Sequence, residues 1–182
     1  MVKFTSTQKK DYSKEKTLKI ERVDILMIKE NKREEKLCLF FASDYHFEMI
    51  SLPYINESLK ENKNVIIMTE NNLDSSVDKV LSNVNLAKEE KDRITKIDWK
   101  NDNLNKFKEV KKASKDGKDT LIFVKGKENY IENMNRNIEN WIDINEVKVV
   151  DCYDINEIKD DVSNIAKKYN GILSTSGVEK LL

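Results

Sequence analysis

The feature that most constrains this chain is an alternation, from residue 37 onward, between short apolar runs and longer charged segments. The runs cover residues 37–41, 65–69, 94–99, 120–125, 147–153 and 172–175. Runs without polar alternation are typical of strands that are buried on both faces, as in a parallel sheet. Strands that alternate with helices through short connections predict an α/β fold, a three-layer sandwich around a mostly parallel central sheet.

The segments between the runs carry apolar residues at helical spacing, so each of them predicts a helix. These helices are expected over residues 44–62, 73–82, 103–115, 129–141 and 155–169. Pro53 lies inside the first of them and predicts a kink or a break. Asp74 or Ser75 is expected to cap the second helix, and Gly117 is expected to follow the end of the third.

Charge separates an N-terminal extension from the rest of the chain. Residues 1–36 hold 11 Lys/Arg against 7 Asp/Glu, whereas the whole chain is neutral with 33 of each. Residues 1–16 lack apolar periodicity, which predicts a mobile basic tail. Residues 17–28 fit an added strand, a docking helix or an arm for a partner. We therefore expect a basic extension over residues 1–36 and one α/β domain over residues 37–182.

The neutral net charge argues against a protein whose main role is to coat nucleic acid or an anionic membrane. No apolar run approaches the roughly 20 residues that span a bilayer. The N-terminus continues into charged residues without the apolar core of a signal peptide. These observations lead us to expect a soluble cytoplasmic protein without a membrane contact.

Cysteine and histidine usage limits the metal and redox chemistry that we expect. Cys38 and Cys152 lie inside apolar runs, which predicts buried thiols in a reducing compartment, with a disulfide or a thiol sensor as the alternative. One histidine and no clustered Cys/His ligands predict no metal site. Trp99 is expected in the core or at its edge rather than as a ligand-stacking platform.

Side chains that follow the apolar runs are the candidates for a binding site, because ligands of open α/β sheets lie beyond the carboxyl ends of the strands. We expect these residues to line a ligand groove: Ser43, Asp44, Tyr45, His46, Glu70, Lys127, Glu128 and Tyr153. Asp44, His46 and Glu128 would supply polar contacts. Tyr45 and Tyr153 would form apolar walls.

Standard catalytic motifs are missing from these loops. The loop after the first run has no glycine, and Gly126-Lys127 lacks the earlier glycine and the following hydroxyl of a P-loop. No GxSxG turn surrounds Ser43 or Ser51. Asp44 and Asp98 suggest a phosphoacceptor site, but the fifth run ends without the lysine that such a site needs. We therefore expect a non-enzymatic protein without a cofactor.

The order of these segments resembles the MEDS domain of methanogen and methylotroph sensory proteins. The resemblance rests on residues 37–46 (LCLFFASDYH), 58–68 (SLKENKNVIIM), 121–128 (LIFVKGKE), 133–141 (NMNRNIENW) and 147–154 (VKVVDCYD). It implies a RecA-like α/β sandwich without a Walker A motif, used as a sensory or interaction module. Relatives in that family occur beside DNA-binding domains, histidine kinase modules and anti-sigma regulators, and some sense small hydrocarbon-like ligands.

The function expected from these observations is that of a cytoplasmic signalling or regulatory protein. It would bind a kinase, a sigma factor or a transcription regulator and be gated by a small ligand. Residues 127–161, with 10 Asp/Glu against 4 Lys/Arg, would form either a solvated face or a surface for a basic partner, including the extension of a second copy in a homodimer.

Two alternatives come from other classes of protein. One is a degenerate nucleotide-binding protein or enzyme that binds nucleotide and magnesium at residues 125–127. The other is a nucleic-acid accessory factor, against which the neutral charge argues. It would act through Lys9, Lys10, Lys14, Lys16 and Lys19.

Overall fold

A computed structural model describes residues 35–140 and 147–181 of the chain. Almost all of the predicted extension, including residues 17–28 and the five lysines named above, lies outside the described residues. The described helices and strands are β1 (Glu35–Phe41), α2 (Asp44–Lys60), β2 (Asn64–Thr69), α3 (Asp74–Asn83), α4 (Lys88–Thr95), α5 (Asn103–Lys115), β3 (Thr120–Lys125), α6 (Glu128–Glu139), β4 (Val147–Asp154), α7 (Val162–Ala166), β5 (Gly171–Ser174) and β6 (Gly177–Lys180).

The strands form one six-stranded sheet in the order β2-β3-β4-β1-β5-β6. All neighbouring pairs are parallel except β5 and β6, which form an antiparallel hairpin at one edge. Strand β1 pairs with β4 along its whole length, so that Phe41 lies beside Asp154 at the carboxyl end. The predicted α/β fold with a mostly parallel sheet is confirmed.

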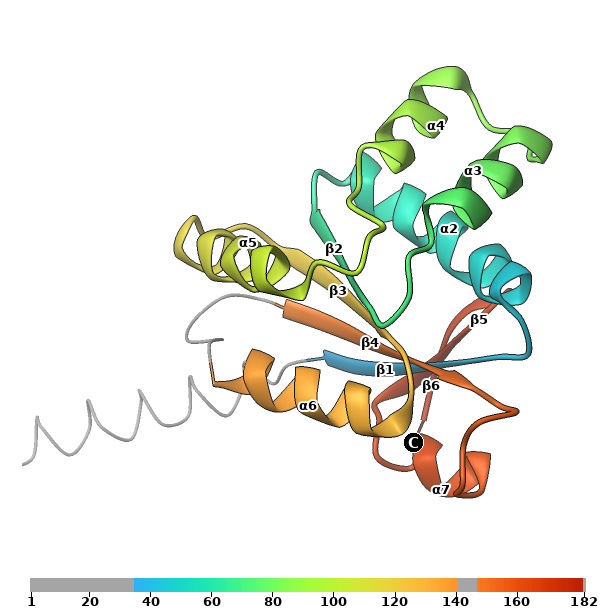
Figure 1. The fold of residues 1–182 in the computed structure, drawn as a ribbon, viewed down its shortest axis with the longest axis vertical. Helices are drawn as coiled ribbons and strands as arrows, with labels where there is room; N and C mark the ends of the chain where they lie inside the picture. The colour runs from blue at the N-terminus through green and yellow to red at the C-terminus, as the bar shows by residue number, and fades with distance from the viewer. Residues whose placement is uncertain (1–34, 141–146, 182) are drawn as a thin grey trace, which may run out of the picture. The chain divides into compact units, whose positions relative to one another are not determined.

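Helices cover both faces of the sheet and complete the three-layer sandwich (Figure 1). One face packs against α2, α3 and α4, with Phe47, Ile55 and Val77 among the buried side chains. The other face packs against α5, α6 and α7, with Val110 and Ile131 in its core. Because successive side chains of a strand point to opposite faces, each buried strand contributes to both cores.

The third predicted strand is wrong. Residues 94–99 end helix α4 and continue into a loop instead of joining the sheet. Ile94 is buried beneath the last turn of α4, and the indole nitrogen of Trp99 donates to the Ile94 carbonyl at 3.0 Å. Trp99 therefore lies in the core, as predicted, but it reaches the core from a loop.

Two helix predictions need correction at their ends. The helix expected over residues 155–169 is only the short α7, which begins after Asp161, whose side chain accepts a hydrogen bond from the Ser163 backbone N–H at 2.9 Å. Helix α3 begins after Leu73, which makes no side-chain cap, so the predicted caps Asp74 and Ser75 lie inside the helix.

Helix α2 continues through Pro53, so the predicted break is absent. Proline has no N–H to donate to the carbonyl of Met49 one turn earlier. Both residues are exposed on the outer side of the helix, where water can hydrogen-bond that carbonyl. The helix ends at Lys60, and Asn62 then adopts a left-handed conformation with φ of 59°.

No helix in the described part of the chain combines the length and the apolar character needed to cross a membrane.

Candidate functional site

The neighbouring strands β1 and β4 connect to helices on opposite faces of the sheet. The connection from β1 to β2 contains α2 on one face, and the connection from β4 to β5 contains α7 on the other. Neighbouring strands whose connections diverge in this way leave a crevice beyond their carboxyl ends, which is where α/β sheets bind ligands. The turn between β1 and α2 therefore lies where a binding site is expected.

Local side chains close the N-terminus of α2. The Ser43 hydroxyl oxygen accepts a hydrogen bond from the His46 backbone N–H at 3.2 Å. In return, the His46 ring nitrogen Nδ1 accepts one from the Ala42 backbone N–H at 3.2 Å. The His46 N–H is one of the first N–H groups of the helix and would otherwise be available to an anion, so the Ser43 cap satisfies part of this helix end.

Asp44 of α2 and Lys125 of β3 form an ion pair at the carboxyl edge of the sheet. The Lys125 ammonium Nζ lies 2.8 Å from Asp44 Oδ1. The lysine side chain is only 8% exposed, whereas the aspartate side chain is 59% exposed. The ammonium also lies 4.8 Å and 5.4 Å from the ring centres of Phe41 and Phe47. The lysine of β3 is therefore held between two aromatic rings and one carboxylate.

A second polar group forms at the carboxyl ends of β2 and β3. Glu70 Oε2 accepts a hydrogen bond from the Lys127 backbone N–H at 2.9 Å. The Asn101 side-chain amide donates to the Glu70 carbonyl at 2.7 Å. Gly126 leaves room for both neighbours, because an added Cβ would lie 2.5 Å from the ring of Tyr130 and 3.1 Å from Glu70 Oε2. The predicted residues Glu70 and Lys127 are thus brought together through the Lys127 backbone.

The remaining predicted residues divide between exposed and buried positions. Tyr45 is 62% exposed, and His46 is also exposed on the first turn of α2. Glu128 begins α6 and is half-buried. Tyr153 is 7% exposed and belongs to the core on the opposite face of the sheet from α2, so it does not join the other residues.

Tyr153 instead belongs to a partly buried polar cluster on the face of the sheet that carries α6 and α7. Its hydroxyl lies 2.6 Å from the Tyr169 hydroxyl, which donates to Asp151 Oδ2 at 2.7 Å. The Asn135 side-chain amide donates to the same carboxylate oxygen at 2.6 Å. Burial raises the pKa of both tyrosine hydroxyls, and the charge of Asp151 raises them further. The cluster stabilises the core and holds both phenols in the protonated form.

The two cysteines lie on neighbouring strands but on opposite faces of the sheet. Cys38 is buried in the core beneath α5–α7, whereas Cys152 is buried in the core beneath α2–α4. Their side chains therefore cannot form a disulfide with each other. Burial raises the pKa of the Cys38 thiol to about 12 and that of Cys152 well above its usual value. The prediction of two buried free thiols is confirmed.

Within residues 35–140 and 147–181, no group of three or more His, Cys, Asp or Glu side chains is placed to hold a metal ion. The Ser43 hydroxyl contacts a backbone N–H rather than the His46 ring in the hydrogen bonds described above. The charged side chains Asp44 and Lys125 at this edge compensate each other.

Comparisons of the chain with protein-family models, with curated proteins and with solved structures found no match. The resemblance to the MEDS domain stays a prediction.

Two features are not predicted from the sequence: the ion pair of Lys125, in β3, and the burial of Glu48, in α2. A lysine at the end of a buried strand is a signal for a charge partner at the sheet edge. The burial of Glu48 is not expected because apolar residues alone define the predicted helix face. The spacing of Glu48 to Leu52 and Asn56, four and eight residues further on, places all three on one helix stripe.

Proposed function

We propose that this chain is a non-enzymatic, cytoplasmic regulatory protein that recognises a partner protein with the first turn of α2. The observation that carries the proposal is that polar groups at that turn are paired with one another. The Lys125 ammonium is paired with Asp44, and the backbone N–H groups of His46 and Ala42 donate to the side chains of Ser43 and His46. A nucleotide phosphate would have to displace all three interactions and approach the Asp44 carboxylate, which favours protein recognition over nucleotide hydrolysis.

The exposed surface of this turn has the chemistry of a protein interface. Tyr45 is an exposed aromatic residue beside the half-exposed Asp44 carboxylate. Tyrosine is enriched at the residues that dominate binding energies, and a surrounding polar rim supplies specificity. The ion pair beneath the turn fixes the position of Asp44, so the surface is preorganised for a partner.

The class of partner comes from the resemblance to the MEDS sensory domain. That resemblance favours a histidine kinase module, a sigma factor or a transcription regulator, with a small ligand that modulates the contact. The basic extension over residues 1–36 would add an electrostatic contribution to an acidic partner or to a second copy of the chain.

The test compares three forms of the full chain in affinity capture from the native host lysate, read by quantitative mass spectrometry. Tyr45→Ala is expected to lower recovery of the specific partner by at least about tenfold, because interface aromatic residues commonly contribute that much affinity. Leu104→Ala is the matched control, since Leu104 is another exposed large side chain, 78% exposed on α5. Equal recovery by the wild type and both variants would overturn the proposal.

Nucleotide binding is the second candidate, and one observation favours it. Lys125 ends β3 with its ammonium beside the β1–α2 turn, where a phosphate-binding lysine would be placed. Calorimetric titration with magnesium-ATP decides between the two. Heat of binding that disappears in Lys125→Met would replace the first proposal with this one.

A further inference from the structure

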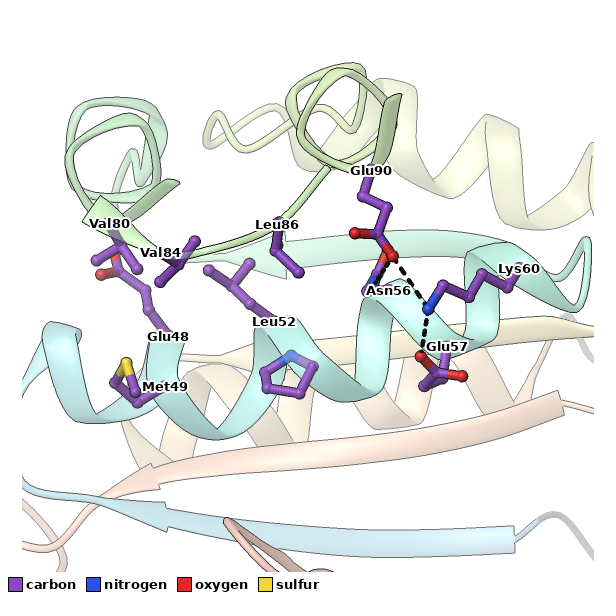
Figure 2. Close-up of a pocket in the computed structure, with 11 residues that line it drawn as sticks. Glu48, Met49, Leu52, Asn56, Glu57, Lys60, Val80, Val84, Leu86 and Glu90 are labelled. Atoms are coloured by element: carbon purple, nitrogen blue, oxygen red, sulfur yellow. Dashed lines mark hydrogen bonds and ion pairs between the residues drawn. The ribbon is translucent and has the colours of Figure 1, made fainter. Parts of the chain in front are cut away.

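A groove separates α2 from α3 and from the connection between α3 and α4 (Figure 2). Its volume is about 300 Å³, which lies in the range of small-molecule sites. Figure 2 shows Glu48 and Leu52 extending from α2 toward Val80 of α3. Val84 and Leu86, from the connection, complete the opposite wall.

Apolar side chains make up most of the lining. Leu52 and Val80 are buried at the base, and Val84 and Leu86 are half-buried. Met49 and Pro53 of α2 also line the groove, and both are exposed. A lining of this kind removes the hydrocarbon part of a ligand from water, and it leaves selectivity to the few polar groups present.

Two residues of the lining, Glu48 and Asn56, carry buried oxygen acceptors whose hydrogen-bonding capacity is unused. Glu48 is 1% exposed and Asn56 is 4% exposed. Within the described part of the chain, neither Glu48 Oε1 nor Asn56 Oδ1 has a hydrogen-bond partner. The Asn56 amide nitrogen, in contrast, donates to Glu90 Oε1 at 3.0 Å. Buried acceptors that lack donors are unfavourable, so a ligand that brings a donor would be favoured.

Charge in the groove selects the kind of donor. The lining contains the carboxylates of Glu48, Glu57 and Glu90 but a single ammonium, that of Lys60. Lys60 is already paired with Glu57 at 2.7 Å and Glu90 at 3.0 Å. Burial raises the pKa of Glu48, with a further increase from Asp44 and opposing effects from Ser76 of α3 and Lys125 of β3. A cation beside Glu48 would compensate its carboxylate, whereas an anion would be repelled.

We propose that this groove binds a small primary amine with an apolar body, whose ammonium group donates to Glu48 Oε1 while its hydrocarbon part packs on Leu52 and Val84. The site is separate from the first turn of α2 and does not depend on the proposed function. It assigns a role to a glutamate that is buried beside the apolar Leu52, a position where packing alone would favour leucine.

The test is a two-dimensional NMR titration of the ¹⁵N-labelled full chain with three probes of equal chain length: hexylamine, hexan-1-ol and hexanoate. Hexylamine is expected to bind at least about tenfold more tightly than hexan-1-ol, because a charge-assisted hydrogen bond is stronger than a neutral one. Hexanoate is expected to bind most weakly. The shifted amide signals should belong to α2, α3 and their connection.

Three variants make the result specific to the groove. Glu48→Gln keeps the size of the side chain but removes its charge, so it should abolish the preference for hexylamine over hexan-1-ol. Glu132→Gln is the matched control, since this α6 side chain is 67% exposed and does not line the groove, and it should change binding less than about twofold. Val84→Phe should fill the groove and weaken both hexylamine and hexan-1-ol.

The unfolding midpoint of each variant shows that it is folded at the temperature of the titration. Equal affinity for hexylamine and hexan-1-ol in the wild type would overturn the proposal. So would hexylamine binding that Glu48→Gln leaves unchanged, or shifts confined to other elements.

Discussion

The ion pair between Asp44 and Lys125 is expected to couple the first turn of α2 to strand β3 energetically. At a separation of 2.8 Å, the Coulomb energy is about 1.5 kcal/mol in the dielectric of water and about 6 kcal/mol at an effective dielectric constant of about 20. Because Asp44 is 59% exposed, the value should lie toward the lower limit. We expect a coupling free energy of about 1.5–3 kcal/mol.

A double-mutant cycle with Asp44→Asn and Lys125→Met measures this coupling. Asp44→Asn leaves the nearly buried ammonium without its carboxylate, although the rings of Phe41 and Phe47 still contact it. It should therefore lower the free energy of unfolding by about 2 kcal/mol, whereas Lys125→Met should change it by less than about 1 kcal/mol, because methionine suits this apolar site. When Lys125 is already replaced by methionine, adding Asp44→Asn should leave the free energy of unfolding almost unchanged.

Urea unfolding followed by circular dichroism is the assay. With a denaturant dependence of about 2 kcal/mol per M, the midpoint for Asp44→Asn should fall by about 1 M. Glu128→Gln, at the first residue of α6, measures the loss of a negative charge at a helix N-terminus, about 0.3–1 kcal/mol. The coupling would be refuted if the changes in unfolding free energy of Asp44→Asn and Lys125→Met add up to that of the double variant within about 0.5 kcal/mol.

Three further predictions concern the core. Tyr169→Phe is expected to lower the free energy of unfolding by about 1–3 kcal/mol, because it removes a hydroxyl that donates to the buried Asp151 carboxylate at 2.7 Å. An unchanged urea midpoint would contradict this role. Gly171→Ala should lower the free energy of unfolding by about 1–3 kcal/mol, because the added Cβ would lie 2.7 Å from a backbone carbonyl oxygen of β6. Hydrogen exchange should show a loss of protection in the β5–β6 hairpin. Unaltered protection would contradict the steric argument. Cys38 and Cys152 should not react with a thiol reagent at mildly alkaline pH until urea unfolds the protein, because burial raises their pKa values; rapid labelling of the native protein would refute this.

The sequence predicts the layers of the fold better than the ends of its elements. Buried strands such as β3 are recognisable because every residue of the run is buried. The strand predicted over residues 94–99 is absent, because Ile94, Ile97 and Trp99 suit the end of a helix and a loop as well as a strand. A tertiary contact decides there, since the Trp99 side chain turns back onto the Ile94 carbonyl.

The sequence contains a signal for the late start of the last helix, α7. Asp161 followed by Ser163 is a capping pattern, and it places the helix start well after residue 155. The preceding residues form a turn after β4, in which the Asn156 backbone N–H donates to Asp154 Oδ1 at 2.9 Å. Local hydrogen bonding by these short polar side chains outweighs the apolar spacing that suggested a longer helix.

The sequence identifies which residues lie at strand ends, but it does not show which strand ends lie side by side. The sequence indicates that Asp44 and Lys125 both follow or end a strand, but their contact depends on the order β3-β4-β1, which local patterns do not specify. The placement of Tyr153 fails for a related reason. Side chains alternate along a strand, so Cys152 and Tyr153 face opposite layers, and only the assembled sheet determines which of them faces α2.

Helix α2 carries the strongest argument for binding in this chain. Its stripe at four-residue spacing contains Asp44, Glu48, Leu52 and Asn56. Asp44 is compensated by Lys125, and Leu52 is an ordinary buried apolar residue. Glu48 lies between them, buried and with one carboxylate oxygen without a donor.

Since leucine fills the next position of the same stripe, stability alone would favour an apolar residue at position 48 as well. Departures from local stability rules are expected where a protein binds a ligand, so Glu48→Gln is expected to stabilise the unliganded fold while it removes the selectivity for amines. A loss of stability in Glu48→Gln would mean that the carboxylate supports the fold, and the case for a ligand site at this position would fail.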